Sequence, residues 1–346
     1  MKSQRTKFLA GLLLAFVLLA FFFREVDWSG LGQALGAARP LPLAGLILVT
    51  VAAYAVRAWR WGDLLLPLGR VGHAELFSAT MIGFASSLLV PRSGELLRPW
   101  LISRRQPIPT SAGFATIIIE RLIDLITVLL LFALCLFVLP PPVLQIEGPL
   151  MAMLTFIGAI AGAAALAALV FLLALHANAE PLVSRLERVL ARAPRWLAEP
   201  IGRLLRSFSD GLAVLRAPAP QLAKIALQSL AVWLLTALGF HLNHIAFAIE
   251  LPFQATFLLI AFLAVGEAIP TPGLIGGFHA FYLLALSEVY GIDRTAAAAA
   301  GIAAHALTNL PVVVFGFALL GREGLSFGRL VDSTRDERKP HDARSS

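Results

Sequence analysis

Three charged side chains interrupt a long apolar stretch of this chain. Arg92, Glu95 and Arg98 lie within the run 74–103, and their i, i+3 spacing would place all three near one side of a helix that begins at the polar turn after Val90. Arginine offers a planar fork of donors that suits phosphate, and ionisable residues within membrane segments are candidates for function by default. We predict that this cluster binds an anionic group. The alternative is that the three charges neutralise one another so that the segment can insert.

A second charged group lies in the apolar run 111–139. Glu120, Arg121 and Asp124 are followed by enough residues for ~22 Å of helix after Asp124, which predicts that they lie in the cytoplasmic third of a span. Two roles remain open for them. One is structural, with Arg121 pairing with Glu95, and the other is direct contact with substrate.

A turn rich in proline and glycine divides the apolar run 253–290. Its residues are Pro270, Pro272, Gly273, Gly276 and Gly277. Glycines let backbone amides approach a ligand, and a helix starting near Gly277 would point its positive N-terminal end at an anion. The alternative is that the glycines only permit a tight turn. His279 beside the turn joins the predicted site, as does Glu267, which we expect to be either a proton-coupling group or a buried ion partner.

The remaining polar candidates are histidines and one asparagine. His305 and Asn309 share a helix face at i, i+4 and are placed with the substrate-binding candidates, while His241 and His244 share another face. No carboxylate or cysteine completes a ligand set at typical spacing, so we expect no metal and instead hydrogen bonds between helices. The sequence contains no G-x-x-x-x-G-K-[ST] motif and no recognisable nucleophile and base pair. We therefore predict no cofactor and no enzymatic activity.

Composition defines the environment in which these residues act. Hydrophobic residues make up 58% of the 346 and charged residues only 14%, which is typical of a membrane protein. The net charge of +7 does not indicate nucleic acid, because the cations lie between and after apolar runs and not in a stripe with stacking aromatics. The single cysteine, Cys135, excludes an intrachain disulfide.

Apolar runs of about 20 residues predict membrane-spanning helices. Six runs are read as full spans: 1–23, 41–61, 111–139, 150–175, 223–248 and 295–320. The first is read as a retained span, because Arg24 follows it and no small-x-small cleavage site does. The runs 74–103 and 253–290 are broken by helix-breaking turns, which are tolerated at membrane depth only inside protein or beside water. We predict an all-α polytopic membrane protein with about six full transmembrane helices and two oppositely oriented re-entrant hairpins.

Charge placement orients these elements. Most of the 28 Lys and Arg residues fall in segments that this layout assigns to the cytoplasm, which predicts cytoplasmic N- and C-termini in a bacterial inner membrane. Oppositely oriented hairpins suggest an inverted repeat, an arrangement in which transport sites lie between the repeats. We divide the chain into one membrane domain, 1–322, and a polar cytoplasmic tail, 323–346. The halves, about 1–175 and 223–322, are joined by a basic cytoplasmic linker, 176–222, read as either an amphipathic surface helix or a solvated connection.

Several aromatic and basic residues near the predicted span ends are interpreted as interfacial anchors. They are Arg57, Trp59, Arg60, Trp61 and Trp100.

Three ordered motifs carry a family resemblance. Val90-Pro91-Arg92-Ser93-Gly94-Glu95-Leu96-Leu97-Arg98, Glu120-Arg121-Leu122-Ile123-Asp124, and Pro270-Thr271-Pro272-Gly273 with Gly276-Gly277 together resemble the lysylphosphatidylglycerol synthase transmembrane region family, also called flippase-like domain proteins. The resemblance extends over roughly residues 5 to 322. It implies movement of a lipid between leaflets. Because only about 25 residues follow the last predicted span, we expect the soluble synthase domain to be absent. Many members carry an acidic residue shortly after the glycine turn, where this chain has Gly277-Phe278-His279.

The leading hypothesis is a flippase that moves an anionic phospholipid or lipid-linked headgroup between leaflets through a polar site formed by the two hairpins. The partner is then a membrane lipid and not a nucleic acid, and a homo-oligomer is compatible with the sequence. One alternative is an intramembrane enzyme acting on lipid headgroups, with Glu95, Asp124 or His279 as acid or base. Another is a non-transporting partner of a lipid or polysaccharide assembly system.

Overall fold

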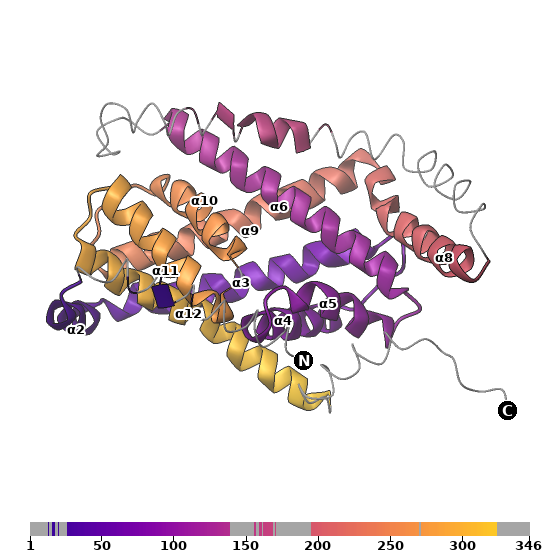
Figure 1. Ribbon diagram of the computed structural model, residues 1–346, viewed down its shortest axis with the longest axis horizontal. Coiled ribbons are helices and arrows are strands. Elements are labelled where there is room, and N and C mark those ends of the chain that lie inside the picture. Colours follow the sequence, from indigo (N-terminus) through magenta and orange to yellow (C-terminus); the bar gives the residue numbers. More distant parts are fainter. Residues whose placement is uncertain are drawn as a thin grey trace.

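A computed structural model describes residues 26–138, 195–269 and 271–323, together with scattered helical positions within 13–20 and 156–170. Every regular element in this part of the chain is helical (Figure 1). The elements are α2 (Trp28–Ala37), α3 (Pro40–Leu65), α4 (His73–Leu89), α5 (Ser93–Ser103), α6 (Thr110–Val138), α8 (Arg195–Gly211), η2 (Leu212–Arg216), α9 (Ala219–Ala246), α10 (Ala255–Ala268), η3 (Pro272–Leu274), α11 (Ile275–Leu283), the π-helical turn η4 (Leu284–Val289) and α12 (Arg294–Arg322).

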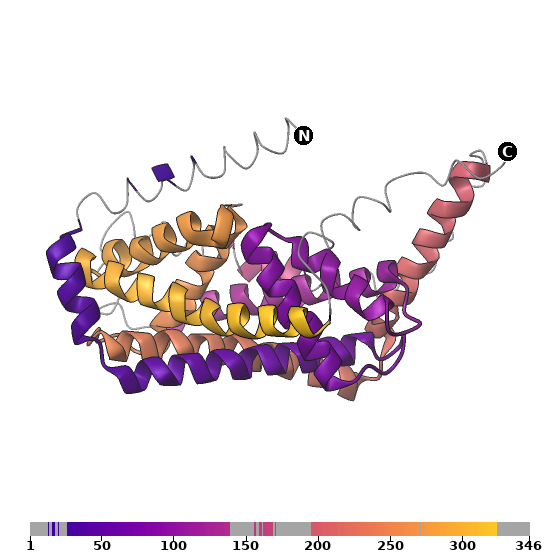
Figure 2. The ribbon, with the colours of Figure 1, turned by 90° about the horizontal axis from the view of Figure 1, so that it is seen from below.

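Three helices are long and apolar enough to cross a membrane: α3, α9 and α12. They coincide with the spans predicted at 41–61, 223–248 and 295–320, and α6 coincides with the run 111–139. In Figure 2, α3, α9 and α12 extend along the long axis of the molecule, and α3 packs along α9. The predicted spans 1–23 and 150–175 lie largely outside the described residues, so the total of six spans stays a prediction.

Local sequence chemistry sets where these helices begin. Pro40 occupies the first turn of α3, where the missing N–H of proline costs nothing. Asp293 caps α12 by accepting a hydrogen bond from the backbone N–H of Ala296 at 2.9 Å. Asp27 caps α2 in the same way, through the backbone N–H groups of Ser29 and Gly30.

The two broken segments are both helical hairpins. In the first, α4 packs against α5, and a Cβ added to Gly94 would overlap the carbonyl oxygen of Gly83. In the second, α10 packs against α11, and a Cβ added to Gly277 would overlap the carbonyl oxygen of Gly266. The two glycines are the same distance apart in sequence in both hairpins. Each hairpin thus depends on one backbone contact that only glycine permits.

The helix after each break starts from a left-handed residue. Arg92 precedes α5 with φ of 63°, and Gly273 and Leu274 precede α11 with φ of 65° and 60°. The two turns approach each other, because α4 contacts η3, and Figure 2 shows the tips of the hairpins meeting near the middle of the bundle. The helix–turn–helix arrangement of both segments is therefore present, while their depth in a membrane stays a prediction.

The predicted linker 176–222 is partly described. It contains α8 and η2, and α8 packs on α6 where Gly211 meets the backbone of Ala112. The arginines at 185, 188 and 192, which contribute to the linker's basic character, lie outside the described residues, as does the tail beyond residue 323.

Candidate functional site

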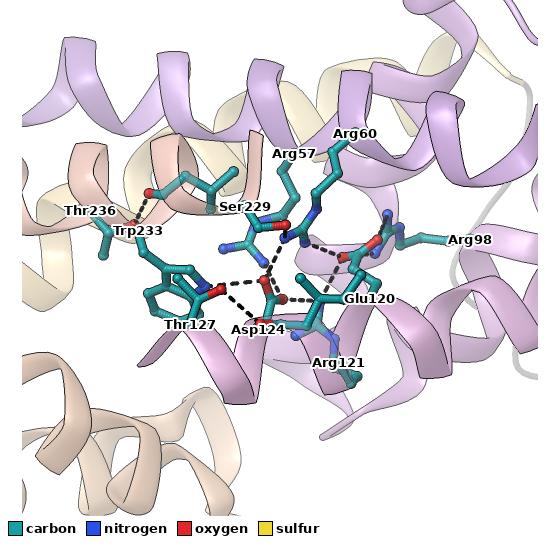
Figure 3. Close-up of polar contacts among 12 residues, drawn as sticks. Arg57, Arg60, Arg98, Glu120, Arg121, Asp124, Thr127, Ser229, Trp233 and Thr236 are labelled. Carbon is teal, nitrogen blue, oxygen red and sulfur yellow. Dashed lines mark hydrogen bonds and ion pairs between the residues drawn. The ribbon is translucent and has the colours of Figure 1, made fainter. Parts of the chain in front are cut away.

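Glu120 lies at the centre of a buried network of ions (Figure 3). Its two carboxylate oxygens accept parallel hydrogen bonds from Arg98, both at 3.1 Å. The same carboxylate lies 2.7 Å from Nη2 of Arg121 and 3.4 Å from Nη2 of Arg60. The Glu120 side chain is fully buried, so these guanidinium groups supply the stabilisation that water would otherwise give.

Asp124, one turn further along α6, extends the network to two other helices. Arg60 and Arg57 of α3 approach its carboxylate at 2.6 and 3.3 Å, and Nε1 of Trp233 on α9 donates to it at 3.1 Å. Arg60 also donates to Oγ of Ser229 at 2.9 Å. Asp124 lies midway along α6, and its partner Trp233 lies midway along α9. The contact is therefore far from the ends of both helices.

The charges in this network do not balance. Two carboxylates, Glu120 and Asp124, face four guanidinium groups, which belong to Arg57, Arg60, Arg98 and Arg121. The ion pairs alone carry two excess positive charges. With Arg92, Glu95 and Glu267, which lie close by, five arginines face four carboxylates, and the group still favours an anion.

A cavity lies beside the network. Its larger chamber has a volume of about 230 Å³, and a chamber of about 190 Å³ adjoins it through five lining residues common to both. The common residues are Phe84, Ser87, Arg121, Glu267 and Leu274. Arg57 lines the larger chamber together with Arg121, so two of the four arginines reach the wall of this chamber, one from α3 and one from α6. Arg98 lines the smaller chamber.

The structure brings the first predicted cluster together. Arg92, Glu95 and Arg98 all line the smaller chamber, with Glu95 and Arg98 on α5 and Arg92 in the turn before it. Arg98 is engaged by Glu120, and its guanidinium lies 4.4 Å from the centre of the Trp61 ring. Arg92 and Glu95 form no ion pair with any described residue, and Arg92 is exposed.

Two interpretations from sequence are wrong. Arg60 and Trp61 are not interfacial anchors, because both are fully buried, and Arg57 lines the cavity. The structural alternative paired Arg121 with Glu95, whereas the ion pair between α5 and α6 among the described residues is Arg98–Glu120. The i, i+3 spacing of Arg57 and Arg60 was the available signal, since it places both on one face of α3, where they meet the carboxylates of α6.

The second hairpin contributes to the larger chamber through several predicted residues. Glu267, His305 and Asn309 line it, and Nε2 of His305 lies 3.0 Å from the carbonyl oxygen of Gly273, which ties α12 to the turn. Asn309 donates to the backbone oxygen of His305 at 2.8 Å. His279 is buried against the His305 ring at 4.9 Å, with Nδ1 2.7 Å from the carbonyl oxygen of Ile275.

The glycines of the second turn have separable roles. Gly277 packs closely on α10, and Gly276 is buried beside it. Gly273 adopts the left-handed turn conformation. Pro272 begins η3, and Pro270 lies outside the described residues.

His241 and His244 of α9 were expected to form hydrogen bonds between helices, but their neighbour Asn243 forms such bonds instead. Asn243 donates to the hydroxyl of Tyr282 at 3.0 Å and to the carbonyl oxygen of Ala300 at 2.9 Å, joining α9 to α11 and α12. The ring nitrogens of buried His244 have no hydrogen-bond partner among the described residues. Within the same residues, no group of three or more His, Cys, Asp and Glu side chains could hold a metal ion.

Long apolar helices around a buried, net cationic site beside a cavity define a multi-pass helical membrane protein. The chain belongs to the family described as "Lysylphosphatidylglycerol synthase TM region", which matches residues 8–316. The resemblance inferred from the three motifs is thereby confirmed.

A curated relative is similar over a shorter stretch. "Glycosyltransferase AglD" of Haloferax volcanii is 32% identical over 128 residues, which are 36% of this chain and 20% of the relative. The chain thus matches about a fifth of that protein's length.

Proposed function

We propose that this protein is a lipid translocase that moves an anionic phospholipid or lipid-linked headgroup between leaflets through the two-chambered cavity. The observation that carries the proposal is the excess of positive charge beside that cavity. Arg57 and Arg121 belong to a network with four arginines and two carboxylates, and both line the larger chamber. The phosphate of a headgroup would supply the missing negative charge.

The arrangement of the hairpins supports passage across the bilayer. Pro91 and Arg92 of the first turn and Leu274 beside the second line one chamber, so both breaks reach a common space. The matched glycine contacts, Gly83 with Gly94 and Gly266 with Gly277, fit two related halves. We propose that the hairpins are re-entrant and enter from opposite sides, as in transporters built from inverted repeats.

In this mechanism the headgroup travels through the cavity while its acyl chains remain in the membrane. Arg57 and Arg121 hold the phosphate, and Arg92, exposed at the first turn, attracts it from the mouth of the smaller chamber. We expect the driving force to come from an ion gradient, the membrane potential or mass action.

Leaflet-to-leaflet movement of labelled phosphatidylglycerol in reconstituted vesicles tests the proposal. A charge-assisted hydrogen bond contributes about 1.5–3 kcal/mol, so R57Q and R121Q should each slow the initial rate by about tenfold or more. R92Q should slow it as well, because it removes the cation at the mouth. R105Q is the matched control, since Arg105 pairs with Glu323 and does not line the cavity. Wild-type transport by the R57Q/R121Q double variant would refute this site.

The partial similarity to a glycosyltransferase favours a second candidate, a non-transporting partner of a glycosyl-transfer system. Vesicles distinguish the two: a partner protein moves no lipid by itself across a broad panel, whereas a translocase does. The contacts give less support to an intramembrane enzyme, because Asp124 is engaged by Arg57, Arg60 and Trp233 and is not poised as an acid or base.

A further inference from the structure

Glu267 differs from the other carboxylates of the site. Glu120 and Asp124 are each paired with arginines, whereas Glu267 forms no hydrogen bond or ion pair with any described residue. Its side chain is exposed and lines both chambers. The cations that act on it are Arg57 and Arg121, the two arginines of the larger chamber.

Other titratable and charged groups line the same space. α3 supplies Tyr54 and Arg57, α6 supplies Arg121, and α12 supplies His305. The first turn and α5 supply Arg92, Glu95 and Arg98. The lining residues from α4 and α9 carry no titratable group. Glu267 is therefore the carboxylate that shares the larger chamber with the arginines proposed to hold a phosphate.

We propose that the cavity binds a phosphate group and a proton together, with Glu267 taking up the proton as the anion settles between Arg57 and Arg121. This inference rests on the proposed function. The Glu267 carboxylate and an incoming anion would share the same chamber and repel each other, and protonation of the carboxylate removes that repulsion. When the cavity is empty, Glu267 is the carboxylate that lines the larger chamber beside the two arginines, in addition to the carboxylates with which they form ion pairs. Headgroup and proton then replace that negative charge together, and a proton gradient can drive the headgroup in the same direction.

The test uses the full chain in vesicles that contain phosphatidylglycerol, whose phosphodiester stays singly charged at mildly acidic and neutral pH. If binding takes up one proton, the apparent affinity for the lipid should rise by up to about tenfold for each pH unit of acidification. E267Q has the shape of the protonated acid, so it should still transport, with a rate that no longer depends on pH and is not driven by a pH gradient.

Two other variants assign the effect to this carboxylate. E95Q removes the second unpaired carboxylate of the cavity and should keep the wild-type pH dependence. E288Q changes a glutamate that pairs with Arg294 away from the cavity, and it should resemble the unmodified protein in every assay. Infrared difference spectra should show a protonated-carboxyl band appearing when phosphatidylglycerol is added to wild type but not to E267Q.

The outcomes separate this inference from the proposed function. Transport that is independent of pH in the wild type, or that keeps the wild-type pH dependence in E267Q, would overturn the inference alone. A pH dependence lost in E95Q and kept in E267Q would likewise reject Glu267. Absence of lipid movement by the wild type at every pH would overturn both proposals.

Discussion

Replacing Glu120 by Gln should destabilise the fold far more than loss of a surface ion pair. The Glu120 side chain is fully buried and accepts from Arg98 through both oxygens, while Arg60 and Arg121 lie within 3.4 Å. Glutamine keeps the shape and one acceptor oxygen but removes the charge. The network then has four guanidinium groups and one carboxylate, Asp124.

The expected magnitude follows from the burial of these groups. Breaking a buried ion pair by removing one partner costs roughly 3–5 kcal/mol, because the other charge is left without compensation. We expect about 3 kcal/mol for E120Q, at the lower end of that range, since Gln still accepts one hydrogen bond. Adding R98M restores the original net charge and removes the guanidinium that Glu120 held bidentately. The double variant should therefore recover part of the loss, with a coupling energy of up to about 3 kcal/mol.

These differences in the free energy of unfolding can be measured in mixed micelles. The protein is titrated with a denaturing detergent, and loss of helix is followed by circular dichroism. R105Q is the control: Arg105 pairs with Glu323 at 3.0 Å, but 44% of its side chain is exposed, so the change should cost about 1 kcal/mol or less. If E120Q is no less stable than R105Q, or if R98M adds its full cost to E120Q, the ion network does not stabilise the fold as argued.

Two further predictions concern the hairpins and the orientation. G94A and G277A should each lower thermal stability by several degrees or prevent folding, because the new Cβ overlaps a backbone carbonyl of the partner helix. G36A is the control: Gly36 faces open space, so this change should be neutral or slightly stabilising. Equal effects of all three would contradict the glycine contacts. A cysteine introduced at Ser209 should be shielded from an impermeant thiol reagent in intact cells, whereas one introduced at Glu250 should react. The native Cys135 is buried and should give no background. Labelling at position 209 from outside would mean that the orientation is the opposite of the one predicted.

Much of the fold could be predicted from sequence, because its signals are local. Apolar runs of membrane length coincide with α3, α6, α9 and α12, and the helix-breaking residues mark both hairpin turns. Arg92, Glu95 and Arg98 do face one chamber, but the i, i+3 spacing accounts only for Glu95 and Arg98, which lie in α5, because Arg92 precedes that helix in a left-handed conformation. Each of these inferences needs only the periodicity of a helix and the conformational limits of proline and glycine.

The partners within the polar network were decided by tertiary structure alone. One of the two alternatives from sequence paired Arg121 with Glu95, and Arg57 and Arg60 were assigned to the interface. Packing instead places Arg60 against Asp124 and Arg98 against Glu120. A guanidinium selects its carboxylate by distance, and that distance depends on the rotation and relative depth of helices far apart in the chain. From the sequence alone it follows that buried charges need partners. The packing of α3, α5 and α6 determines which partners they have and which arginines line the cavity.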